Sequence, residues 1–487
     1  EGFQEKFVRS NLDFVIGGGS MGGGKLNPLY TPVLTPNGWV KIGDLKVGDH
    51  VCTPFGSPVP IIQIFEHHDK DIYEVETFDG RTAHCGLEHL WSFRTTKQIH
   101  KYRQHGDVAK NLTTEDTKSM IDRIDNGQAI YLPICHAQEF EEKSFVIPPY
   151  ILGVILGDGC VTDASSSTSF TISNSEEDIV QKVFDISESE RVRHNQSNYH
   201  KTFFSNKAKA FNDYLKSVSL DTYSYNKFIP QEYLWGSIEQ RKALLCGLMD
   251  TDGCVEDKNR FSFSTTSERL AEDFMYLCRS LGYVVTKKTD KRQGKYTCGV
   301  AYDISIQTDD IIFSSKKHLS RYNANLDKST RKYARTNDHI RIKSITKIGK
   351  SDARCIWIDD PIHLYIIDDF IVTHNTAAAV MCSGEPSLDS RYRAVYLRNN
   401  LGDLKSGGGI LDEFKKIYGK GCNVVESGDP HVDFPSGARI DVTHIADQSK
   451  DKVLQRFKGR QYDFIYFDEG TGFTWECFTA VYSRNRG

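Results

Sequence analysis

A phosphate-binding loop is interrupted in this sequence, and the interruption limits how the rest of the chain can be organised. The run GGGSMGGGK, which ends at Lys25, supplies the pattern G-x-x-x-x-G-K but lacks the hydroxyl residue that should follow it as a Mg²⁺ ligand. Leu26 stands there instead, and the missing hydroxyl occurs at Thr376 in NTAAAV. Joining Lys25 to Thr376 restores a strand, a loop and an Ala-rich helix. Residues 26–375 are therefore predicted to be an insert of 350 residues.

A second motif supports a nucleotide site in the flanking segments. The stretch YDFIYFDEG is an apolar strand that ends in two acids. In ATPases with such a loop, the first acid holds the Mg²⁺ shell and the second orients the attacking water. The alternative is a buried strand with a solvated acidic end. The predicted binding groups for ATP and Mg²⁺ are Gly19, Gly24, Lys25, Thr376 and Asp468, with Glu469 as the catalytic acid and Gln4 as a weak adenine contact.

The position of the insert helps to decide between two possible functions of the chain. A stable insert between Lys25 and Thr376 would leave no working nucleotide site, which favours an insert that removes itself. The alternative is an ATPase that carries a regulatory or decayed insert without splicing activity.

The insert resembles an intein along its whole length. The resemblance rests on TPVLTPNGWVKIGDLKVGDHV, on DGRTAHCGLEHLW, on ARCIWIDDPIHLYIIDDFIVTHN, and on the ending His374-Asn375 followed by Thr376. It implies an all-β, horseshoe-shaped Hint-type splicing domain formed by residues 26–145 and 335–375 together.

The first residue of the insert departs from the usual intein pattern. Most inteins begin with Cys or Ser, whereas this insert begins with Leu26, which has no nucleophile. This would fit an inactive element, but the class 3 inteins also lack the first nucleophile and carry a Trp, Cys and Thr set elsewhere. Trp91, Cys355 and Thr373 stand at the matching places. The insert therefore resembles a class 3 intein.

This resemblance implies a role for each residue. Cys355 attacks the carbonyl of Lys25, because a thiolate is the strongest nucleophile near neutral pH. His89 protonates the departing amine, a normal role for an imidazole. Trp91 packs beside the thiol and Thr373 hydrogen-bonds at the junction. In the later steps Thr376 accepts the acyl group, Asn375 cyclises and His374 donates a proton. Splicing needs no cofactor.

Two further segments of the insert repeat each other. ILGVILGDG (151–159) and LCGLMDTDG (245–253) are apolar helical runs that end in an acid and a glycine. They resemble the motifs of two-repeat LAGLIDADG homing endonucleases, which implies an α/β domain over residues 146–334. Gly153 and Gly247 should let two helices approach closely, and Asp158 and Asp252 should meet and hold Mg²⁺. The final glycine of each motif is expected to end its helix in the αL conformation.

Double-stranded DNA is the partner that this second resemblance implies. The basic stretches TKKTDKRQGK (286–295) and KSTRKYARTNDHIRIK (328–343) are candidate contacts, with a solvated surface as the equal alternative for each. The overall charge of −4 gives no global sign of nucleic-acid binding, so such contacts must be local.

The flanks, residues 1–25 and 376–487, resemble fragments of the α/β P-loop ATPase in a phage terminase large subunit. The resemblance rests on the rejoined loop, on FIYFDEGTGF and on the final YSRNRG. It implies DNA packaging with a portal protein and a small terminase subunit as partners. Another P-loop DNA motor is the competing interpretation.

The length of 487 residues predicts a multi-domain protein, and the terminase resemblance implies that it acts in the bacterial cytoplasm during phage infection. Hydrophobic residues make up 39% and charged residues 26% of the chain, which is ordinary for globular domains. The sequence has no run of about 18 apolar residues, so no membrane span is expected. Its twelve cysteines are scattered singly, which favours reduced thiols.

Overall fold

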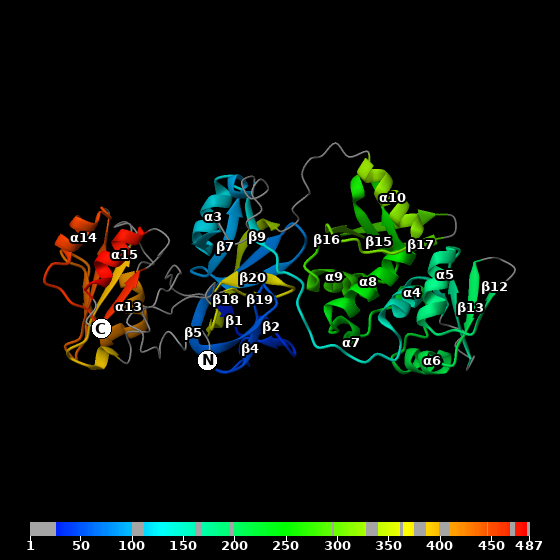
Figure 1. Cartoon of the computed structure of the whole chain (residues 1–487), viewed down its shortest axis with the longest axis horizontal. Helices are drawn as coiled ribbons and strands as arrows, with labels where there is room; N and C mark the ends of the chain where they lie inside the picture. The colour runs from blue at the N-terminus through cyan, green and yellow to red at the C-terminus, as the bar shows by residue number, and fades with distance from the viewer. Residues whose placement is uncertain are drawn as a thin grey trace.

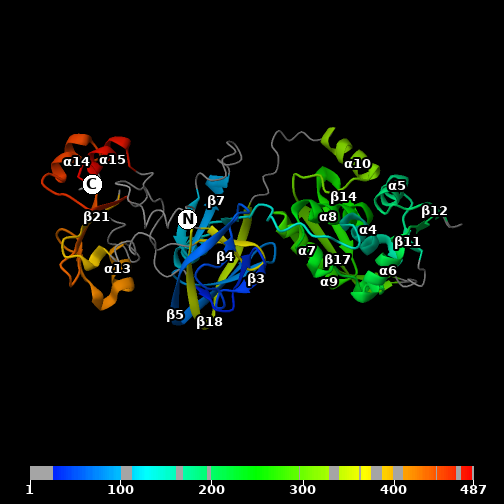
Figure 2. The same ribbon diagram turned by 60° about the horizontal axis from the view of Figure 1, so that its bottom comes forward.

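The computed structural model describes residues 26–99, 112–160, 168–194, 199–294, 297–327, 339–360, 364–374, 386–398, 410–445, 447–467 and 473–484. Figure 1 shows these residues as three lobes, and Figure 2 shows the same lobes from a second direction. We call them the β lobe (27–133 and 339–374), the repeat lobe (147–327) and the C-terminal lobe (386–484). Within the described residues, no helix has both the length and the apolar character needed to cross a membrane.

The β lobe combines two stretches that are far apart in the sequence. Its two longest strands, β5 (Pro58–Thr77) and β18 (His339–Ile358), pair antiparallel although the whole repeat lobe lies between them in the sequence. The other elements are β1 (Asn27–Pro28), β2 (Pro32–Thr35), β3 (Gly38–Lys41), β4 (His50–Cys52), β6 (Thr82–Gly86), β7 (Leu90–Thr95), β8 (Thr113–Asp116), α3 (Thr117–Asp125), β9 (Ile130–Pro133), β19 (Leu364–Ile367) and β20 (Ile371–His374).

These strands form two sheets around a shared core. One sheet has the order β4-β5-β18-β9-β7-β8, with β1 paired to β18 and β6 paired to β5, and the other has the order β20-β19-β2-β3. Apolar residues from both stretches of sequence, including Val33, Trp91 and Ile356, are fully buried together between these strands. The lobe is thus β-rich and assembled from both ends of the predicted insert, as the intein resemblance implied.

Helix α3 shows that the lobe is β-rich and not all-β. Asp116 caps the helix by accepting a hydrogen bond from the backbone N–H of Ser119, a favourable start for a helix. Met120, on the inner face of α3, is fully buried in the core of the β lobe. A short helix therefore fits here because its cap and its apolar contact are both local.

The repeat lobe contains two copies of one arrangement. The first copy is α4 (Pro149–Asp158), β10 (Gly159–Cys160), β11 (Ser169–Ser173), α5 (Glu177–Ile186), β12 (Arg191–His194), β13 (His200–Phe204) and α6 (Ala208–Ser217). The second copy is α8 (Ile238–Asp252), β14 (Gly253–Val255), β15 (Phe261–Thr265), α9 (Glu268–Ser280), β16 (Val284–Gly294), β17 (Thr297–Gln307) and α10 (Lys316–Asp327). Between the copies lie η1 (Ser224–Asn226) and α7 (Gln231–Leu234), and η2 (Asp257–Asn259) lies within the second.

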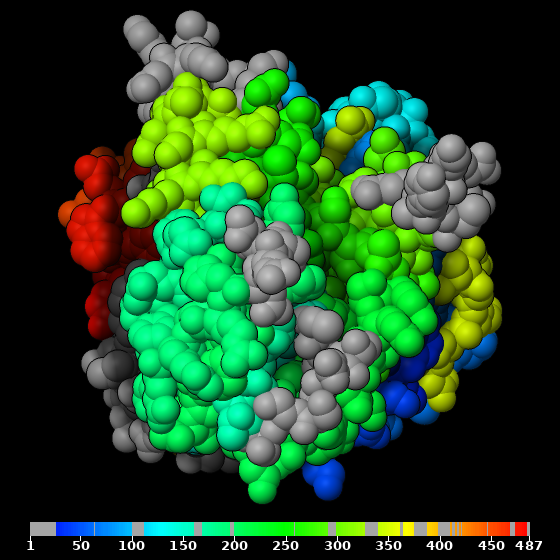
Figure 3. Space-filling model, turned by 90° about the vertical axis from the view of Figure 1, so that its right-hand side faces the viewer, coloured from blue at the N-terminus to red at the C-terminus, as the bar shows by residue number. Residues whose placement is uncertain are grey.

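The two copies also share a sheet topology. Their antiparallel sheets have the orders β10-β11-β13-β12 and β14-β15-β17-β16, which match strand for strand. Figure 3 looks at the end of the molecule that this lobe occupies and shows the two copies side by side. The internal repeat predicted from the two sequence motifs is confirmed.

Glycines bring the two repeated helices, α4 and α8, into backbone contact. A Cβ added at Gly153 would lie 2.4 Å from the carbonyl oxygen of Leu244, and one at Gly247 would lie 2.2 Å from that of Tyr150. Any larger side chain would push the helices apart, because these distances are far below van der Waals contact. The predicted role of Gly153 and Gly247 is confirmed.

The predicted αL conformation of the terminal glycines is wrong. Gly159 has φ −72° and ψ 133°, and Gly253 has φ −83° and ψ 159°, so both lead from the helix directly into an extended strand. Glycine is required there for space: a Cβ would lie 2.4 Å from the Ile155 carbonyl oxygen or 2.2 Å from that of Met249.

We expect Gly247→Ala to destabilise the repeat lobe by about 2–3 kcal/mol, since its methyl group must displace the backbone of α4. Calorimetric unfolding of the intact chain measures this change. Gly299→Ala is the matched control, because a Cβ at Gly299 meets nothing within 4 Å. Equal unfolding temperatures for the two variants would contradict the packing argument.

The C-terminal lobe is a mixed α/β unit. It contains η3 (Pro386–Leu388), β21 (Arg393–Arg398), α13 (Ile410–Tyr418), η4 (Gly419–Gly421), β22 (Asn423–Val425), β23 (His431–Asp433), β24 (Arg439–His444), α14 (Lys450–Arg456), β25 (Phe464–Phe467) and α15 (Trp475–Tyr482). The sheet order is β22-β23-β24-β21-β25, and β21 runs parallel to both β24 and β25. The strand predicted in YDFIYFDEG is β25.

Several predicted residues lie outside the described part of the chain. They are Gln4, Gly19, Gly24, Lys25, Asn375, Thr376, Asp468 and Glu469. The phosphate loop therefore stays a prediction, and so do the domain boundaries near residues 145 and 335.

Candidate functional site

The first residue of the insert is buried against the predicted nucleophile. Strand β1 pairs antiparallel with β18, with Asn27 opposite Arg354 and Pro28 opposite Ala353. Continuing this register by one residue sets Leu26 opposite Cys355. The two side chains belong to one buried cluster, which also contains Ile72 and Ala353. Cys355 is 6% exposed and forms no disulfide.

Hydrogen bonds fix the backbone at this end of the insert. The carbonyl of Leu26 accepts from the backbone N–H of Gly86 at 2.8 Å. The Asn27 amide donates to the carbonyl of His84 at 3.0 Å, and its oxygen accepts from the hydroxyl of Tyr365 at 2.9 Å. A Cβ at Gly86 would lie 3.1 Å from that of Leu26, so the glycine allows the close approach. Leu26 is thereby held next to Cys355.

The other end of the insert reaches the same region through β19 and β20. Tyr365 is paired with Thr373 across these strands, and Leu364 with His374. The hydroxyl of Thr373 lies 2.5 Å from Nε2 of His89. Thr373 is fully buried and His374 is 6% exposed. The predicted residues His89, Thr373 and Cys355 are therefore collected around Tyr365 and Asn27, although the sequence separates them widely.

Trp91 supports His89. Its ring lies 5.0 Å from the imidazole ring between centroids, and its Nε1 donates to the hydroxyl of Thr117 at 3.2 Å. Thr117 in turn donates to the carbonyl of His89 at 3.1 Å. Trp91 and Thr117 thus fix the backbone and ring of His89, while the expected packing of Trp91 beside the thiol stays a prediction.

Sequence reasoning missed two members of this group, Asn27 and Tyr365. Burial raises the pKa of Tyr365 well above its ordinary value, and electrostatic repulsion from Cys355 adds to this rise. A phenol that stays protonated can only donate to Asn27 and cannot act as a base. The available signal was the polar Asn27 beside a predicted cleavage point, but its partner is distant in sequence.

The acids of the repeated motifs meet at the ends of α4 and α8. A Cβ at Gly157 would lie 3.2 Å from Oδ2 of Asp252, which places the end of one helix against the acid of the other. Burial raises the pKa of Asp252 to about 7, and the charge of Asp158 adds to that rise. Burial also raises the pKa of Asp158, although Asn174 opposes this by donating to its Oδ2 at 2.6 Å.

These acids fit a magnesium ion. Two carboxylates that are partly withdrawn from water and repel each other are stabilised by a divalent cation between them. Mg²⁺ commonly takes one or two carboxylates and completes its shell with water and substrate phosphate oxygens. Among the described residues no group of three or more Asp, Glu, His or Cys side chains is suited to a metal.

Lys227 is a functional candidate that the sequence did not reveal. Its Nζ donates to four backbone carbonyls at the end of α4, those of Ile155, Leu156, Gly157 and Gly159, at 2.9–3.3 Å. The lysine is 5% exposed, and its charge lowers the pKa of both Asp158 and Asp252. It therefore stabilises the helix end and the charged acids together. No periodic pattern marks Lys227, because it lies in a connecting segment.

Comparison with known proteins identifies the second half of the repeat lobe. Residues 239–327 match the family described as LAGLIDADG-like domain. This range begins at α8 and ends at α10, so it contains the second copy of the repeat.

Two curated relatives are replicative DNA helicases of the DnaB type. The protein of Mycobacterium intracellulare is 28% identical over 393 residues, covering 77% of this chain and 62% of its own length. That of Mycobacterium leprae is 32% identical over 83 residues, covering 16% of this chain and 14% of its own length. The longer match spans about 375 residues of this chain, and only 137 residues lie outside 26–375. Most of the match must therefore lie within the insert.

Solved structures of inteins also match. They include the Msm DnaB1 intein splicing domain (33% identity, 14% of this chain, 55% of that chain), the gp41-1 intein (32%, 15% and 55%) and a MchDnaB-1 intein variant (31%, 19% and 72%), each with a TM-score of 0.14. The chain thus carries a LAGLIDADG-like domain at residues 239–327, and it is similar in sequence to these inteins.

Proposed function

We propose that residues 26–375 are a class 3 intein that excises itself and joins Lys25 to Thr376. The observation that carries this proposal is the pairing of β1 with β18, which buries Leu26 and Cys355 in one cluster. An insert that begins with leucine needs a nucleophile from elsewhere, and Cys355 is a thiol beside that first residue.

The first step exchanges an amide for a thioester. The Cys355 sulfur attacks the carbonyl carbon of Lys25, and the Lys25–Leu26 C–N bond breaks. His89 delivers a proton to the nitrogen of Leu26, which leaves as an amine. The contacts of His89 with Trp91 and Thr373 fix the ring for this transfer.

The remaining steps return a normal peptide bond. The hydroxyl of Thr376 attacks the thioester, which forms an ester and restores the Cys355 thiol. The side-chain amide of Asn375 then attacks its own carbonyl, so that a succinimide forms and the amine of Thr376 is freed, with His374 as proton donor. That amine attacks the ester, which regenerates the Thr376 hydroxyl and forms the Lys25–Thr376 bond. No cofactor is needed.

A mass measurement separates splicing from its alternative. We expect the chain of 55.2 kDa to yield a free insert and a shorter ligated product. An unchanged band with ATPase activity would instead indicate an ATPase carrying a non-splicing regulatory or decayed insert.

We expect Thr373→Val to slow splicing by about 10- to 100-fold. The substitution keeps the shape of the side chain but removes the hydroxyl that contacts His89, and an unsatisfied buried polar group costs about 1–3 kcal/mol. Thr373→Ser keeps the hydroxyl and is the control. A time course on a denaturing gel gives both rates, and similar slowing in the two variants would show that the methyl group matters instead.

The repeat lobe is proposed to be a homing endonuclease that cleaves double-stranded DNA with Mg²⁺. The family match at 239–327 and the matching topology of the two copies support this activity. Asp158 and Asp252 would hold the metal, which supplies charge stabilisation for a phosphodiester displacement. Lys227 opposes the rise in the pKa of both acids and so favours their charged form. Cleavage of the DNA allele that lacks the insert tests this function.

The spliced flanks are proposed to form a P-loop ATPase of a phage terminase large subunit, acting with ATP and Mg²⁺ in the infected bacterial cytoplasm. The parallel pairing of β21 and β25 supports an ATPase sheet of this kind. The DnaB relatives name a different DNA motor. The longer match spans about 375 residues and the insert has 350, so at least about 25 matched residues lie in the flanks, and a DnaB-type helicase is the competing host. Two assays of the spliced protein distinguish the two possible hosts. A terminase should package DNA together with a portal protein and a small subunit, whereas a helicase should unwind DNA strands.

A further inference from the structure

The turn that precedes β20 has an unfavourable backbone. Its three residues, Asp368, Asp369 and Phe370, have φ angles of 24°, 51° and 66°. Residues other than glycine are destabilised in such conformations, which persist only where the surroundings hold them. Strand β20 begins at Ile371, directly after the turn, and carries Thr373 and His374. The geometry of the turn therefore sets the position of the C-terminal end of the insert.

Helix α9 of the repeat lobe holds this turn from outside. Arg279 forms an ion pair with the carboxylate of Asp369. One helical turn earlier, the ring of Tyr276 packs edge-on against Phe370 with centroids 5.1 Å apart. The Tyr276 hydroxyl also accepts from Nε1 of Trp39 at 3.1 Å. Two neighbouring positions of α9 thus contact two neighbouring residues of the turn.

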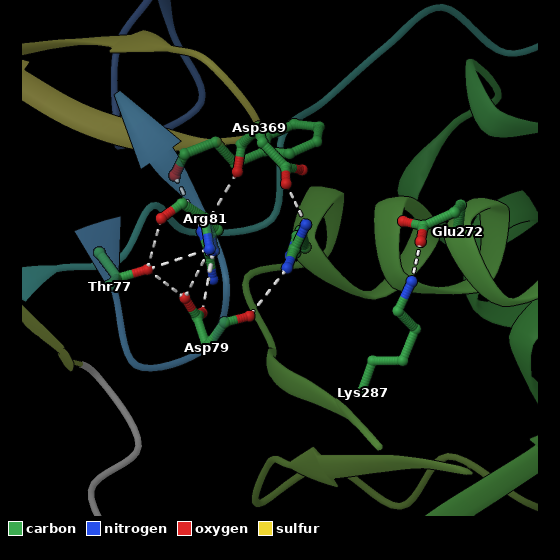
Figure 4. Close-up of polar contacts among 8 residues, drawn as sticks. Thr77, Asp79, Arg81, Glu272, Lys287 and Asp369 are labelled. Atoms are coloured by element: carbon green, nitrogen blue, oxygen red, sulfur yellow. Dashed lines mark hydrogen bonds and ion pairs between the residues drawn. The ribbon is translucent and has the colours of Figure 1, made fainter. Parts of the chain in front are cut away.

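A second arginine, from the β lobe, holds the same turn (Figure 4). Arg81 donates to the carbonyls of Asp369 and Phe370 at 3.4 and 3.2 Å, and to Oδ2 of Asp79 at 3.0 Å. Arg279 also donates to the carbonyl of Asp79 at 3.2 Å. The two arginines are 2% and 5% exposed, whereas the side chain of Asp369 is 36% exposed, so the network is buried on the arginine side and reaches water at Asp369.

The charges in this network balance only when both lobes are present. Burial raises the pKa of Asp369, and Arg279 opposes this rise more strongly than Arg81 does. Without Arg279, the Asp369 carboxylate would lose its largest compensating charge. An acid in this environment then tends to protonate or to turn toward water, and either change loosens the turn.

We infer that Arg279 of the LAGLIDADG-like domain is a positioning residue for the C-terminal splicing step, which it controls through Asp369 and β20. This inference rests on the proposed splicing function. The N-terminal junction is held by different groups, namely Gly86, His84 and Tyr365. Thr373 on β20 also contacts His89, so Arg279 acts directly on the cyclisation of Asn375 and only indirectly, through that contact, on the attack by Cys355.

The two steps can be separated in one time course of the intact chain. In Arg279→Gln we expect the branched intermediate, formed by transfer to Cys355 and Thr376, to form within twofold of the parental rate. Its conversion to the spliced product should slow by at least tenfold. Asp369→Asn should give the same pattern, and Arg279→Lys should recover part of the rate because it restores a charge but not the second contact with Asp79.

Lys287→Gln is the matched control. Lys287 forms an ion pair with Glu272, which lies on α9 but does not touch the turn (Figure 4). Calorimetric unfolding of each variant shows whether it remains folded. A folded Arg279→Gln variant that splices at the parental rate, or one that slows both steps equally, would overturn the inference. If the parental chain does not splice at all, the proposed function fails as well, so the two failures are distinguishable.

Discussion

Replacing Cys355 with alanine is expected to leave the 55.2 kDa chain uncleaved between Lys25 and Leu26. The expected loss is at least about 10³-fold, because removing a covalent nucleophile commonly costs this much or more. The substitution deletes one sulfur from a buried cluster and keeps the pairing of β1 with β18, which involves the backbone. A loss of cleavage would therefore be due to the missing nucleophile and not to a displacement of Leu26.

The control must remove a buried thiol without touching the junction. Cys52 is 3% exposed in the same lobe, and burial raises the pKa of its thiol to about 12. Such a thiol is almost never ionised at neutral pH, so Cys52→Ala should splice at nearly the parental rate. Mass spectrometry of the products distinguishes both variants from the parent. Normal splicing by Cys355→Ala would contradict the class 3 assignment.

The sequence predicted the site best where a short local motif directly determines the contact, as in the two repeated motifs. The two motifs at 151–159 and 245–253 imply close helices, and the backbone contacts at Gly153 and Gly247 confirm this. The same motifs misled the prediction for their final glycines. An Asp-Gly helix end resembles an αL cap, whereas here the chain continues at once into a strand and glycine is needed for space.

Contacts between distant segments were not predictable in this way. Cys355 was found through its resemblance to a family position, and its closeness to Leu26 depends on strand pairing that no local pattern contains. Lys227 and Arg279 act on groups from other elements, and each is unremarkable in its own stretch of sequence. A buried cation is identified by its partners, and those appear only after folding.

Replacing Asp252 with asparagine is expected to abolish DNA cleavage while splicing continues. The side chain keeps its size, so the contact between α4 and α8 is retained, but the site loses one of two opposed carboxylates. Removing a charge that a metal-dependent displacement needs commonly costs about 10²–10³-fold or more. Asp158→Asn should have the same effect, since the two acids lie next to each other at the adjacent ends of α4 and α8.

Magnesium binding gives a second readout that does not depend on the DNA substrate. In the parent, Mg²⁺ should raise the unfolding temperature of the repeat lobe, because an ion that binds only the folded state stabilises it by RT ln(1 + [L]/Kd). Asp252→Asn should lose most of this rise. Asp257→Asn is the control, since Asp257 is an exposed acid in the same stretch. If Asp252→Asn still cleaved DNA at the parental rate, the acids at the helix ends would be structural and the nuclease site would lie elsewhere.

A variant that loses both cleavage and the Mg²⁺ effect but still splices would show that the two activities of the insert use separate residues.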